Sequence, residues 1–290
     1  MAVSLAQAVR AAAKRGTPLP HIDWLEGLYE GGTEIYRGSL TVFAGTPGAR
    51  KTMFAVAVVE SLNRPALYFS ADSDEGVIAP RVLAHRTGQT ARDVRHQLNT
   101  SDEACSYYES TEFDSPVGYV FDPGPSIGDI YDEVSAWVEL HDAYPEVIVV
   151  DNLLDVYADF DSEHQGFKAV LKEFKTLARL TGAAVIVTHH HREEDKAVAT
   201  RPLGRKSMQG RPTQTPALVL SVAVDGYDEF FISVVKDRNG PSHPEADQYI
   251  TLRSDPERNT FSKTVTLQRR TEEAFGAPVA WSPTDVLERT

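Results

Sequence analysis

Short apolar runs alternate with amphipathic stretches along this chain, and the alternation predicts strands and helices in turn. Residues 147–150, Val-Ile-Val-Val, form an uninterrupted apolar run, as expected of a strand that is buried on both faces. In 127–141, by contrast, Ile127, Ile130 and Val134 recur at helical spacing. This pattern favours an α/β fold, with a mostly parallel sheet and helices on both of its faces.

The same pattern locates the remaining elements. Further strands are predicted at 40–44, 66–70, 117–122 and 183–188, and further helices at 51–62, 77–85, 90–98 and 165–180. Three closely spaced strand-like segments follow, which predict antiparallel strands at one edge of the sheet: 217–224, 230–235 and 248–253. We expect an N-terminal helix (4–15) and linker arm over 1–21, a core over 22–255, and a peripheral strand and polar tail over 256–290.

Composition restricts the class of protein. The 290 residues are sufficient for one large α/β domain with short extensions, or for two small domains. No apolar run approaches the roughly 18–20 residues that span a bilayer, and the N-terminus lacks the features of a signal peptide, so a cytoplasmic location is expected. The single cysteine, Cys105, excludes an intrachain disulfide and a cysteine cluster for zinc.

Residues 45–52 carry the clearest chemical motif. They read Gly45-Thr46-Pro47-Gly48-Ala49-Arg50-Lys51-Thr52, between a predicted strand and a predicted helix, which is the layout of a phosphate-binding P-loop. Backbone N–H groups of the turn would face the phosphates of ATP, Lys51 would reach the β- and γ-phosphates, and Thr52 would ligate Mg²⁺. The alternative is a chance Gly/Pro turn before a helix.

Arg50 departs from the usual GxxxxGK[ST] pattern, which has glycine at this position. A side chain here would cost about 1 kcal/mol or more if the backbone angle φ is positive. Arg50 would then point outward, add a cation near the phosphates, or weaken ATP binding. We expect function to survive because the other motifs are intact.

Asp151 follows the apolar strand 147–150, so it is expected at the carboxyl edge of the sheet, beside the phosphate turn. There its carboxylate would hold Mg²⁺, usually through water. A strand that ends in Asp is common by itself, but it becomes informative when it lies downstream of a P-loop.

Three further segments resemble motifs of DnaB-type replicative helicases. They are Tyr68-Phe69-Ser70-Ala71-Asp72 with Arg81-Val82-Leu83-Ala84, Val185-Ile186-Val187-Thr188-His189, and Lys236-Asp237-Arg238-Asn239-Gly240-Pro241. The resemblance covers about Trp24 to Arg253 and is to the RecA-like motor domain of the family, particularly its short phage and plasmid forms. It implies a P-loop ATPase core that uses ATP and Mg²⁺ and assembles as a ring, expected to be a hexamer.

The resemblance also implies roles for individual residues. Asp72 stands where the family has a Glu that activates the attacking water, and His189 stands where a polar residue senses the γ-phosphate. Lys236 and Arg238 would project into the active site of the neighbouring subunit as sensor and arginine finger. The partners implied are single-stranded DNA, other copies of the chain, and a primase or helicase loader.

More ordinary interpretations stay open for these residues. Asp72, Asp74 and Glu75 would also suit a solvated turn in which Asp74 caps the next helix, and Glu75 is the second candidate for the base. Three consecutive histidines raise the possibility of a metal site, but neighbours at a strand end point to opposite faces. Asn239-Gly240 would also suit a plain hairpin turn.

The net charge of −13 has the wrong sign for a nucleic-acid binder, so DNA binding would need a local basic patch. Residues 196–224 contain five basic residues and no Asp or Glu: Lys196, Arg201, Arg205, Lys206 and Arg211. We predict DNA binding by Arg201, Arg205, Lys206 and Arg211, at the place where the family has a loop facing the pore. A solvated loop in an acidic protein is the alternative.

The leading hypothesis is therefore a ring-forming, ATP-dependent DNA helicase or translocase. A RecA-like recombinase or recombination mediator, which would form a filament on DNA, is the second. A regulatory ATPase of the circadian-clock type that binds no DNA is the third.

Overall fold

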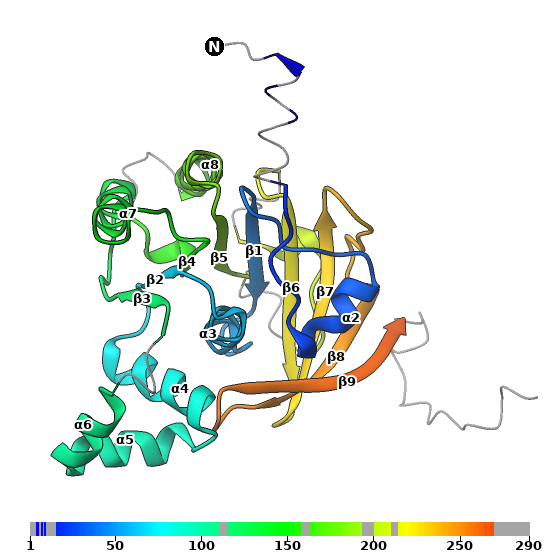
Figure 1. Cartoon of the computed structure of the whole chain (residues 1–290). Coiled ribbons are helices and arrows are strands. Elements are labelled where there is room, and N and C mark those ends of the chain that lie inside the picture. Colours follow the sequence, from blue (N-terminus) through cyan, green and yellow to red (C-terminus); the bar gives the residue numbers. More distant parts are fainter. Residues whose placement is uncertain are drawn as a thin grey trace, which may run out of the picture.

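In the computed structural model of the chain, a single sheet organises the core (Figure 1). The structure describes Ser4, Leu5, Gln7, Val9 and residues 16–110, 115–157, 163–192, 200–209 and 214–269, without the side chains of 163–164 and 264–269. Most of the predicted N-terminal helix at 4–15 therefore lies outside the described residues, as do Lys196, Arg211 and the tail beyond 269.

The sheet has nine strands in the order β3-β2-β4-β5-β1-β6-β7-β8-β9. The strands are β1 (Leu40–Gly45), β2 (Ala66–Ser70), β3 (Val117–Val120), β4 (Val147–Asp151), β5 (Ala184–His190), β6 (Leu218–Asp225), β7 (Glu229–Asp237), β8 (Gln248–Asp255) and β9 (Thr260–Arg269). Strands from β3 to β6 pair in parallel, and β6 to β9 pair antiparallel. The predicted fold class, a mostly parallel sheet with antiparallel edge strands, is thus confirmed.

Helices cover both faces of this sheet (Figure 1). They are α2 (Glu26–Glu30), α3 (Lys51–Leu62), α4 (Glu75–Thr87), α5 (Ala91–Thr100), α6 (Asp102–Tyr108), α7 (Ile127–His141) and α8 (Glu163–Thr181). Apolar residues of α3 and α4 pack on one face together with Leu25 and Leu28, and those of α7 and α8 pack on the other. Helix α3 is buried almost all round, as its run of alanines and valines requires.

Side-chain caps fix several helix starts. The Asp74 Oδ1 atom accepts a hydrogen bond from the Val77 backbone N–H (3.0 Å), so Asp74 caps α4 as the sequence allowed. Ser126 and Asp129 form a reciprocal capping box at the start of α7. Asp74 is thereby assigned to helix initiation, and it does not line the cavity described below.

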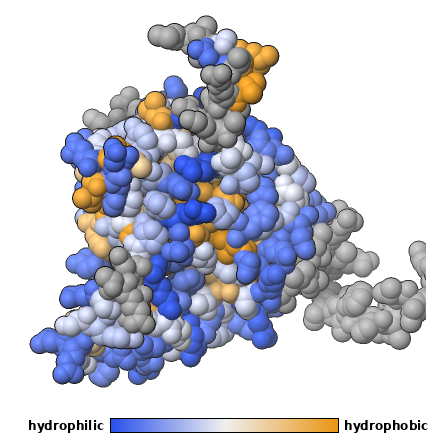
Figure 2. Space-filling model, viewed as in Figure 1, coloured by the Kyte–Doolittle hydropathy of each residue, from blue (hydrophilic) through white to orange (hydrophobic). Residues whose placement is uncertain are grey.

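Two short helices, α2 and α6, were not predicted. Their sequences, EGLYE and DEACSYY, are too short to show a helical period. No helix in the described part of the chain is long and apolar enough to cross a membrane. Hydrophilic residues cover most of the described surface in the view of Figure 2, with hydrophobic residues in small patches.

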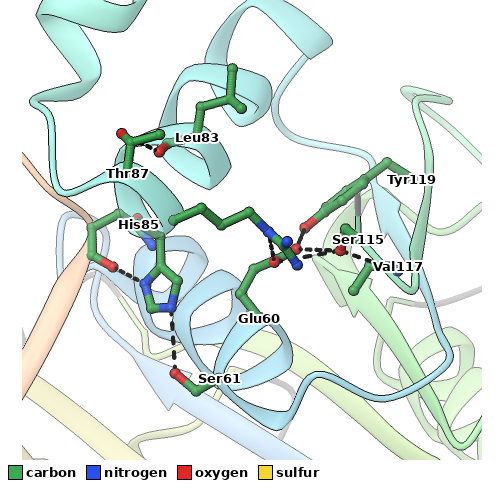
Figure 3. A network of polar contacts seen from close by, with 10 residues as sticks. Glu60, Ser61, Leu83, His85, Thr87, Ser115, Val117 and Tyr119 are labelled. Atoms are coloured by element: carbon green, nitrogen blue, oxygen red, sulfur yellow. Dashed lines mark hydrogen bonds and ion pairs between the residues drawn. The ribbon is translucent and has the colours of Figure 1, made fainter. Parts of the chain in front are cut away.

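A buried ion pair joins α3, α4 and the start of β3 (Figure 3). Glu60, on α3, has a side chain with no exposed area, and one of its oxygens lies 2.7 Å from Arg86 Nε on α4. The hydroxyls of Tyr119 and Ser115 donate to the same carboxylate at 2.6 and 3.1 Å. These donors satisfy a charge that would be very costly if left unpaired.

A second set of polar contacts in Figure 3 links α4 to the β8–β9 turn. The His85 ring donates from Nδ1 to the backbone carbonyl of Asn259 (2.9 Å), since a carbonyl only accepts. His85 Nε2 lies 3.5 Å from the Ser61 hydroxyl, which in turn accepts from the Trp24 indole N–H (3.1 Å). This chain of contacts fixes Asn259 beside the first turn of α3, where Asn259 Nδ2 donates to the Met53 carbonyl (3.4 Å).

Candidate functional site

The phosphate-binding turn has the expected order of strand, turn and helix, because β1 ends at Gly45 and α3 begins at Lys51. Two glycines are required by its geometry. A Cβ atom at Gly45 would lie 3.0 Å from both Ala49 and Val222, and Gly48 has φ of +80°. The turn therefore brings its backbone close to the end of β6, and the N-terminus of α3 points toward the space above the sheet edge.

Arg50 adopts the left-handed conformation, with φ 58° and ψ 33°. This is a conformation that glycine tolerates best, which explains the glycine of the usual motif. The Arg50 side chain extends toward β8, where its Nη1 donates to the Ser254 hydroxyl (2.8 Å). Burial lowers the pKa of Arg50, and the nearby Tyr227 and Asp228 oppose this shift.

The Lys51 ammonium lies over the turn. Its Nζ donates to the carbonyls of Gly45 (3.2 Å) and Thr46 (3.1 Å), and it lies 3.4 Å from Nδ1 of His190. Burial lowers the pKa of Lys51 to about 8, although the charges of Asp151 and Asp72 oppose the shift. The side chain is therefore placed where added phosphate charge would stabilise its protonated form.

Asp151 ends β4 and is only 2% exposed. Its Oδ2 accepts from the Tyr68 hydroxyl (2.9 Å) on β2, and its Oδ1 accepts from the Thr188 hydroxyl on β5. Because both flanking strands contribute a donor, the carboxylate is fixed in orientation. Each oxygen keeps a lone pair for a further contact, so the group fits the predicted role of holding Mg²⁺ through water.

A cavity of about 440 Å³ opens above these residues at the carboxyl edge of the parallel strands. It brings together most of the predicted site, including Lys51, Thr52, Asp72 and Asp151. It is lined by Pro47, Gly48, Arg50, Lys51, Thr52, Met53, Asp72, Ser73, Arg81, Asp151, Asn152, His190, Pro256 and Asn259. Glu75 is not among them, so the geometry favours Asp72 over Glu75 as the group that meets water in this cavity.

The three consecutive histidines face different surroundings. His189 is fully buried, packs edge-on against Phe167 and donates from Nε2 to the Gln209 carbonyl (2.8 Å). His190, instead, lines the cavity beside Lys51. The residue expected to sense the γ-phosphate, His189, is therefore not in the cavity lining, whereas the neighbouring His190 is, because successive side chains on a strand alternate.

No metal site is formed by these histidines in the described part of the chain, where no group of three His, Cys, Asp or Glu side chains is suitably placed to hold an ion. Burial, with the charges of His189, Lys51 and His190, lowers the pKa of His191 to about 3. Burial and the Lys51 charge lower the pKa of His190 to about 4. Both rings are therefore neutral at pH 7.

Lys236 and Arg238 lie far from the P-loop of their own chain. Strand β7 is antiparallel to β6, and Leu218, the first residue of β6, is opposite Asp237. The Arg238 backbone N–H donates to the Ala217 carbonyl, just before β6 begins (3.0 Å). The hairpin after β7 is therefore at the edge where the parallel strands start, whereas the P-loop is at the edge where they end (Figure 1).

Basic side chains gather around this hairpin. Burial lowers the pKa of Lys236 to about 8, and the positive charges of Arg238, Arg205 and Lys175 add to the shift. The Lys236 ammonium donates to the carbonyls of Pro216 (2.5 Å) and Gln214 (3.1 Å). Arg205, predicted to bind DNA, is thus brought into the same positive region as the predicted finger.

The other described basic residues of this loop form ion pairs with acidic side chains. Arg201 pairs with Asp225 (2.9 Å) and stacks over the Phe231 ring, with 4.3 Å to its centroid. Lys206 pairs with Glu245 (3.0 Å), and both of these side chains are largely exposed. Arg201 therefore holds the loop against the sheet, while Lys206 is placed on the surface.

Sequence reasoning missed several residues of the cavity. His190 could have been found from the alternation of side chains along a strand. Arg81 was named above as part of a motif, but it was given no role. Outside the cavity lining, the hydroxyls of Tyr68 and Thr188 reach the Asp151 carboxylate only because β2 and β5 flank β4. Pro256 and Asn259, from the β8–β9 turn, carry no signal in the sequence that would place them over α3.

A P-loop at the end of β1, an Asp at the end of β4 and this strand order define a P-loop NTPase with a RecA-like core. The sequence belongs to a family described as an AAA domain, whose model matches residues 6–196.

Its relatives include two phage proteins. It is 28% identical over 261 residues to the Gene 65 protein of Mycobacterium phage L5, covering 85% of this chain and 93% of that protein. It is 31% identical over 221 residues to the Gene 65 protein of Mycobacterium phage D29, covering 71% and 91%. It is also 29% identical over 181 residues to DNA repair protein RAD51 homolog 4 of Bos taurus, covering 59% and 52%.

Solved structures show the same fold. A chain described as an ATPase domain superposes with a TM-score of 0.73 at 15% identity, covering 90% of this chain and 96% of that one. A DnaB-like replicative helicase, solved in a study of its interactions with primase, superposes with a TM-score of 0.73 at 14% identity, covering 91% and 68%. The predicted RecA-like core of DnaB-type helicases is thus confirmed as the fold of this chain.

Proposed function

We propose that the protein is an ATP-dependent DNA helicase or translocase that works as a ring, with each ATP site shared between two subunits. The observation that carries this proposal is the separation of Arg238 from the P-loop of its own chain, at opposite edges of the sheet. A hairpin with basic side chains at that edge serves no purpose for the local site, but it can reach the exposed cavity of a neighbouring copy.

The residues of the cavity divide the work of hydrolysis. The backbone N–H groups of the turn and the Lys51 ammonium bind the phosphates, and Thr52 with Asp151 holds the metal ion. Mg²⁺, when bound with the nucleotide, neutralises charge that develops on the phosphates. Asp72 accepts a proton from the attacking water or orients it, and Lys236 and Arg238 of a neighbouring subunit stabilise the transferring phosphoryl group.

Asp72 is shorter by one methylene than the Glu that the helicase family carries. The backbone N–H groups of Ala71 and Asp72 both donate to the Asp151 carbonyl, at 2.8 and 3.4 Å, which holds this segment against the end of β4. These two hydrogen bonds hold Asp72 beside Asp151, where it lines the cavity. We infer that this placement compensates for the shorter side chain.

His190 takes the place we predicted for His189 in this scheme. Its ring is neutral and accepts from the Lys51 ammonium through Nδ1, so its Nε2 carries the proton. A donor on the γ-phosphate side of Lys51 suits a residue that responds to whether that phosphate is present. His189 is assigned instead to fixing the segment that ends at Gln209.

A mixing experiment tests the shared site. Lys51→Ala subunits keep Arg238, and Arg238→Ala subunits keep the P-loop, so a mixed ring has some interfaces with both groups intact. We expect each variant alone to be almost inactive, because an arginine supplied by a neighbour contributes about 10³–10⁵ in rate, and the mixture to regain measurable ATPase activity. Arg64→Ala, an exposed arginine in the turn after α3, is the matched control.

Subunit exchange must be verified in that mixture, by energy transfer between labelled chains. Full activity of Arg238→Ala in a verified oligomer would refute the shared site. So would an absence of rescue after exchange, if Arg238→Ala still binds ATP with the affinity of the wild type.

Single-stranded DNA is the proposed substrate of the motor, bound by Arg205, Lys206 and Arg211. Arg201, which was also predicted to bind DNA, pairs with Asp225 and would instead position the loop. The supporting observation is the gathering of positive charge from Arg205, Lys236 and Lys175 on a protein whose net charge is −13. Stimulation of ATP hydrolysis by single-stranded DNA, measured at several salt concentrations, tests this part. A rate that DNA leaves unchanged would favour the regulatory ATPase of the clock type.

A recombinase or recombination mediator is the second candidate, and the similarity to RAD51 homolog 4 favours it. Both functions use a RecA-like core on DNA, but a recombinase forms open filaments and the helicase forms closed rings. Electron microscopy with ATP and single-stranded DNA distinguishes them. A primase or loader as partner, and a cytoplasmic location, belong to the helicase proposal and stand or fall with it.

A further inference from the structure

Arg50 lines the cavity, and the function proposed above gives it no task. It occupies a position where the backbone is left-handed, at a φ of 58°, and where glycine would avoid the strain. Strained positions of this kind persist where the surrounding structure holds them and are concentrated at functional sites. A function of the Arg50 side chain, which glycine would lack, would explain why the strained backbone is kept.

The strand order fixes which half of a nucleotide would meet this side chain. Strand β1 carries the turn, with β5 and β4 on one side and β6, β7 and β8 on the other. Asp151 and His190 lie at the ends of β4 and β5, so the terminal phosphate belongs on that side. The nucleoside must then leave the turn toward β8, where Pro256 and Asn259 line the same cavity.

The Arg50 guanidinium lies on this second side. Its Nη1 donates to Ser254, which is 4% exposed near the end of β8, and the side chain lines the cavity together with Pro256. Ser254 is itself fixed, because its backbone N–H donates to the Asp228 carbonyl (2.7 Å). The guanidinium is thus anchored through one of its five N–H groups, and the Arg50 side chain is part of the cavity lining.

We propose that Arg50 binds the ribose and base half of the nucleotide, with its guanidinium plane stacked on the purine ring, and so makes affinity depend on the nucleoside rather than on the phosphates alone. A guanidinium is well suited to this because it stacks on aromatic rings while its edge stays hydrogen-bonded. The Lys51 ammonium remains the cation of the phosphates.

The inference rests on the proposed ATP site, and a competition assay separates the two. Binding of ATP and of inorganic tripolyphosphate, each with Mg²⁺, is measured by displacement of a fluorescent ATP analogue. Arg50→Gly is expected to weaken ATP binding about five- to thirtyfold, which corresponds to roughly 1–2 kcal/mol of stacking, and to leave tripolyphosphate binding unchanged or slightly tighter.

Arg50→Lys keeps the charge but removes the planar face, so it is expected to lose nearly as much ATP affinity as Arg50→Gly. Arg253→Ala is the matched control, since Arg253 precedes Ser254 on the same strand but is largely exposed and pairs with Asp228 at 3.4 Å. Thermal unfolding of each variant checks that the fold is retained.

Each other outcome overturns the inference in a distinct way. Equal loss of ATP and tripolyphosphate affinity would make Arg50 a phosphate ligand. Tighter binding of both by Arg50→Gly would make Arg50 a source of strain alone, and wild-type affinity in Arg50→Lys would make its charge, rather than its plane, the active feature. Failure of the wild-type protein to bind ATP at all would instead refute the proposed function.

Discussion

Burial sets the protonation state of His191, which directly follows β5. His191 is 1% exposed, and in the described residues neither of its ring nitrogens has a hydrogen-bond partner. Its pKa is lowered to about 3, so the folded protein binds no proton there at any pH in ordinary use. The unfolded chain binds one below about pH 6.5.

We therefore expect His191 to weaken the fold in mild acid. Above about pH 6.5 the ring is neutral in both states and the effect is absent. Below about pH 6.5 the unfolded chain binds a proton on His191 that the folded protein does not bind. The free energy of unfolding therefore falls by up to about 1.4 kcal/mol per pH unit. Urea unfolding of wild type and His191→Gln between about pH 7 and pH 5 measures the difference in slope, and parallel curves would contradict this account.

Lys51 gives nucleotide binding a pH dependence of its own. Its pKa is about 8 without phosphates nearby, and their negative charge would raise it, so ATP binding takes up a proton near pH 8–9. We expect ATP affinity to fall by up to about tenfold per pH unit as pH rises above about 8. Calorimetry in buffers of different ionisation enthalpy detects the proton, and Lys51→Met should remove both effects.

The residue scale also shows what a sequence leaves undecided. The strand at 183–188 was predicted, but its end was placed two residues early, and that difference decides which histidine enters the cavity. The sequence analysis considered the case that Arg50 has a positive φ. The contact of Arg50 with Ser254, however, joins positions far apart in the chain. Local pattern carries no information about such a contact.

At the scale of elements, the start of α4 separates two acidic residues that lie close together in the sequence. Asp72 lines the cavity, while Glu75 is in the first turn of the helix, outside it. We expect Asp72→Asn to bind ATP normally and to hydrolyse it about 10²–10⁴-fold more slowly, and Glu75→Gln to keep the wild-type rate. Steady-state ATPase assays of the two variants test the assignment, and a reversed pattern would transfer the role to Glu75.

The Glu60–Arg86 ion pair joins α4 to α3 (Figure 3). Arg86→Met leaves a buried carboxylate without its cation and is expected to destabilise the fold by about 3–5 kcal/mol. Arg253→Met, which removes an exposed pair with Asp228, is expected to cost less than about 1 kcal/mol. Urea unfolding at neutral pH compares them, and equal losses would show that the buried pair has no special weight.

At the scale of the whole molecule, the sequence predicted the strands of the sheet well, but it predicted the contacts between distant segments that pack on the sheet less well. Uninterrupted apolar runs identified the central strands, since these are buried on both faces. The parallel pairing of the central strands followed from the alternation of strands and helices, but the order of the strands in the sheet was not predicted. The contacts that bring the β8–β9 turn over α3, through His85 and Asn259, join residues far apart in the sequence, so they could not be predicted from local pattern.

The two edges of the sheet carry complementary halves of the proposed shared site, and such a site would make the protein's own abundance a control on its activity. A lone chain holds Lys51 and Asp151 at one edge and Arg238 at the other, and cannot bring them together. Turnover per chain would then not be a constant but would decline on dilution below the assembly concentration and reach a plateau above it. A cell that makes little of the protein would hold an inactive stock, and activity would begin abruptly once synthesis passes that threshold.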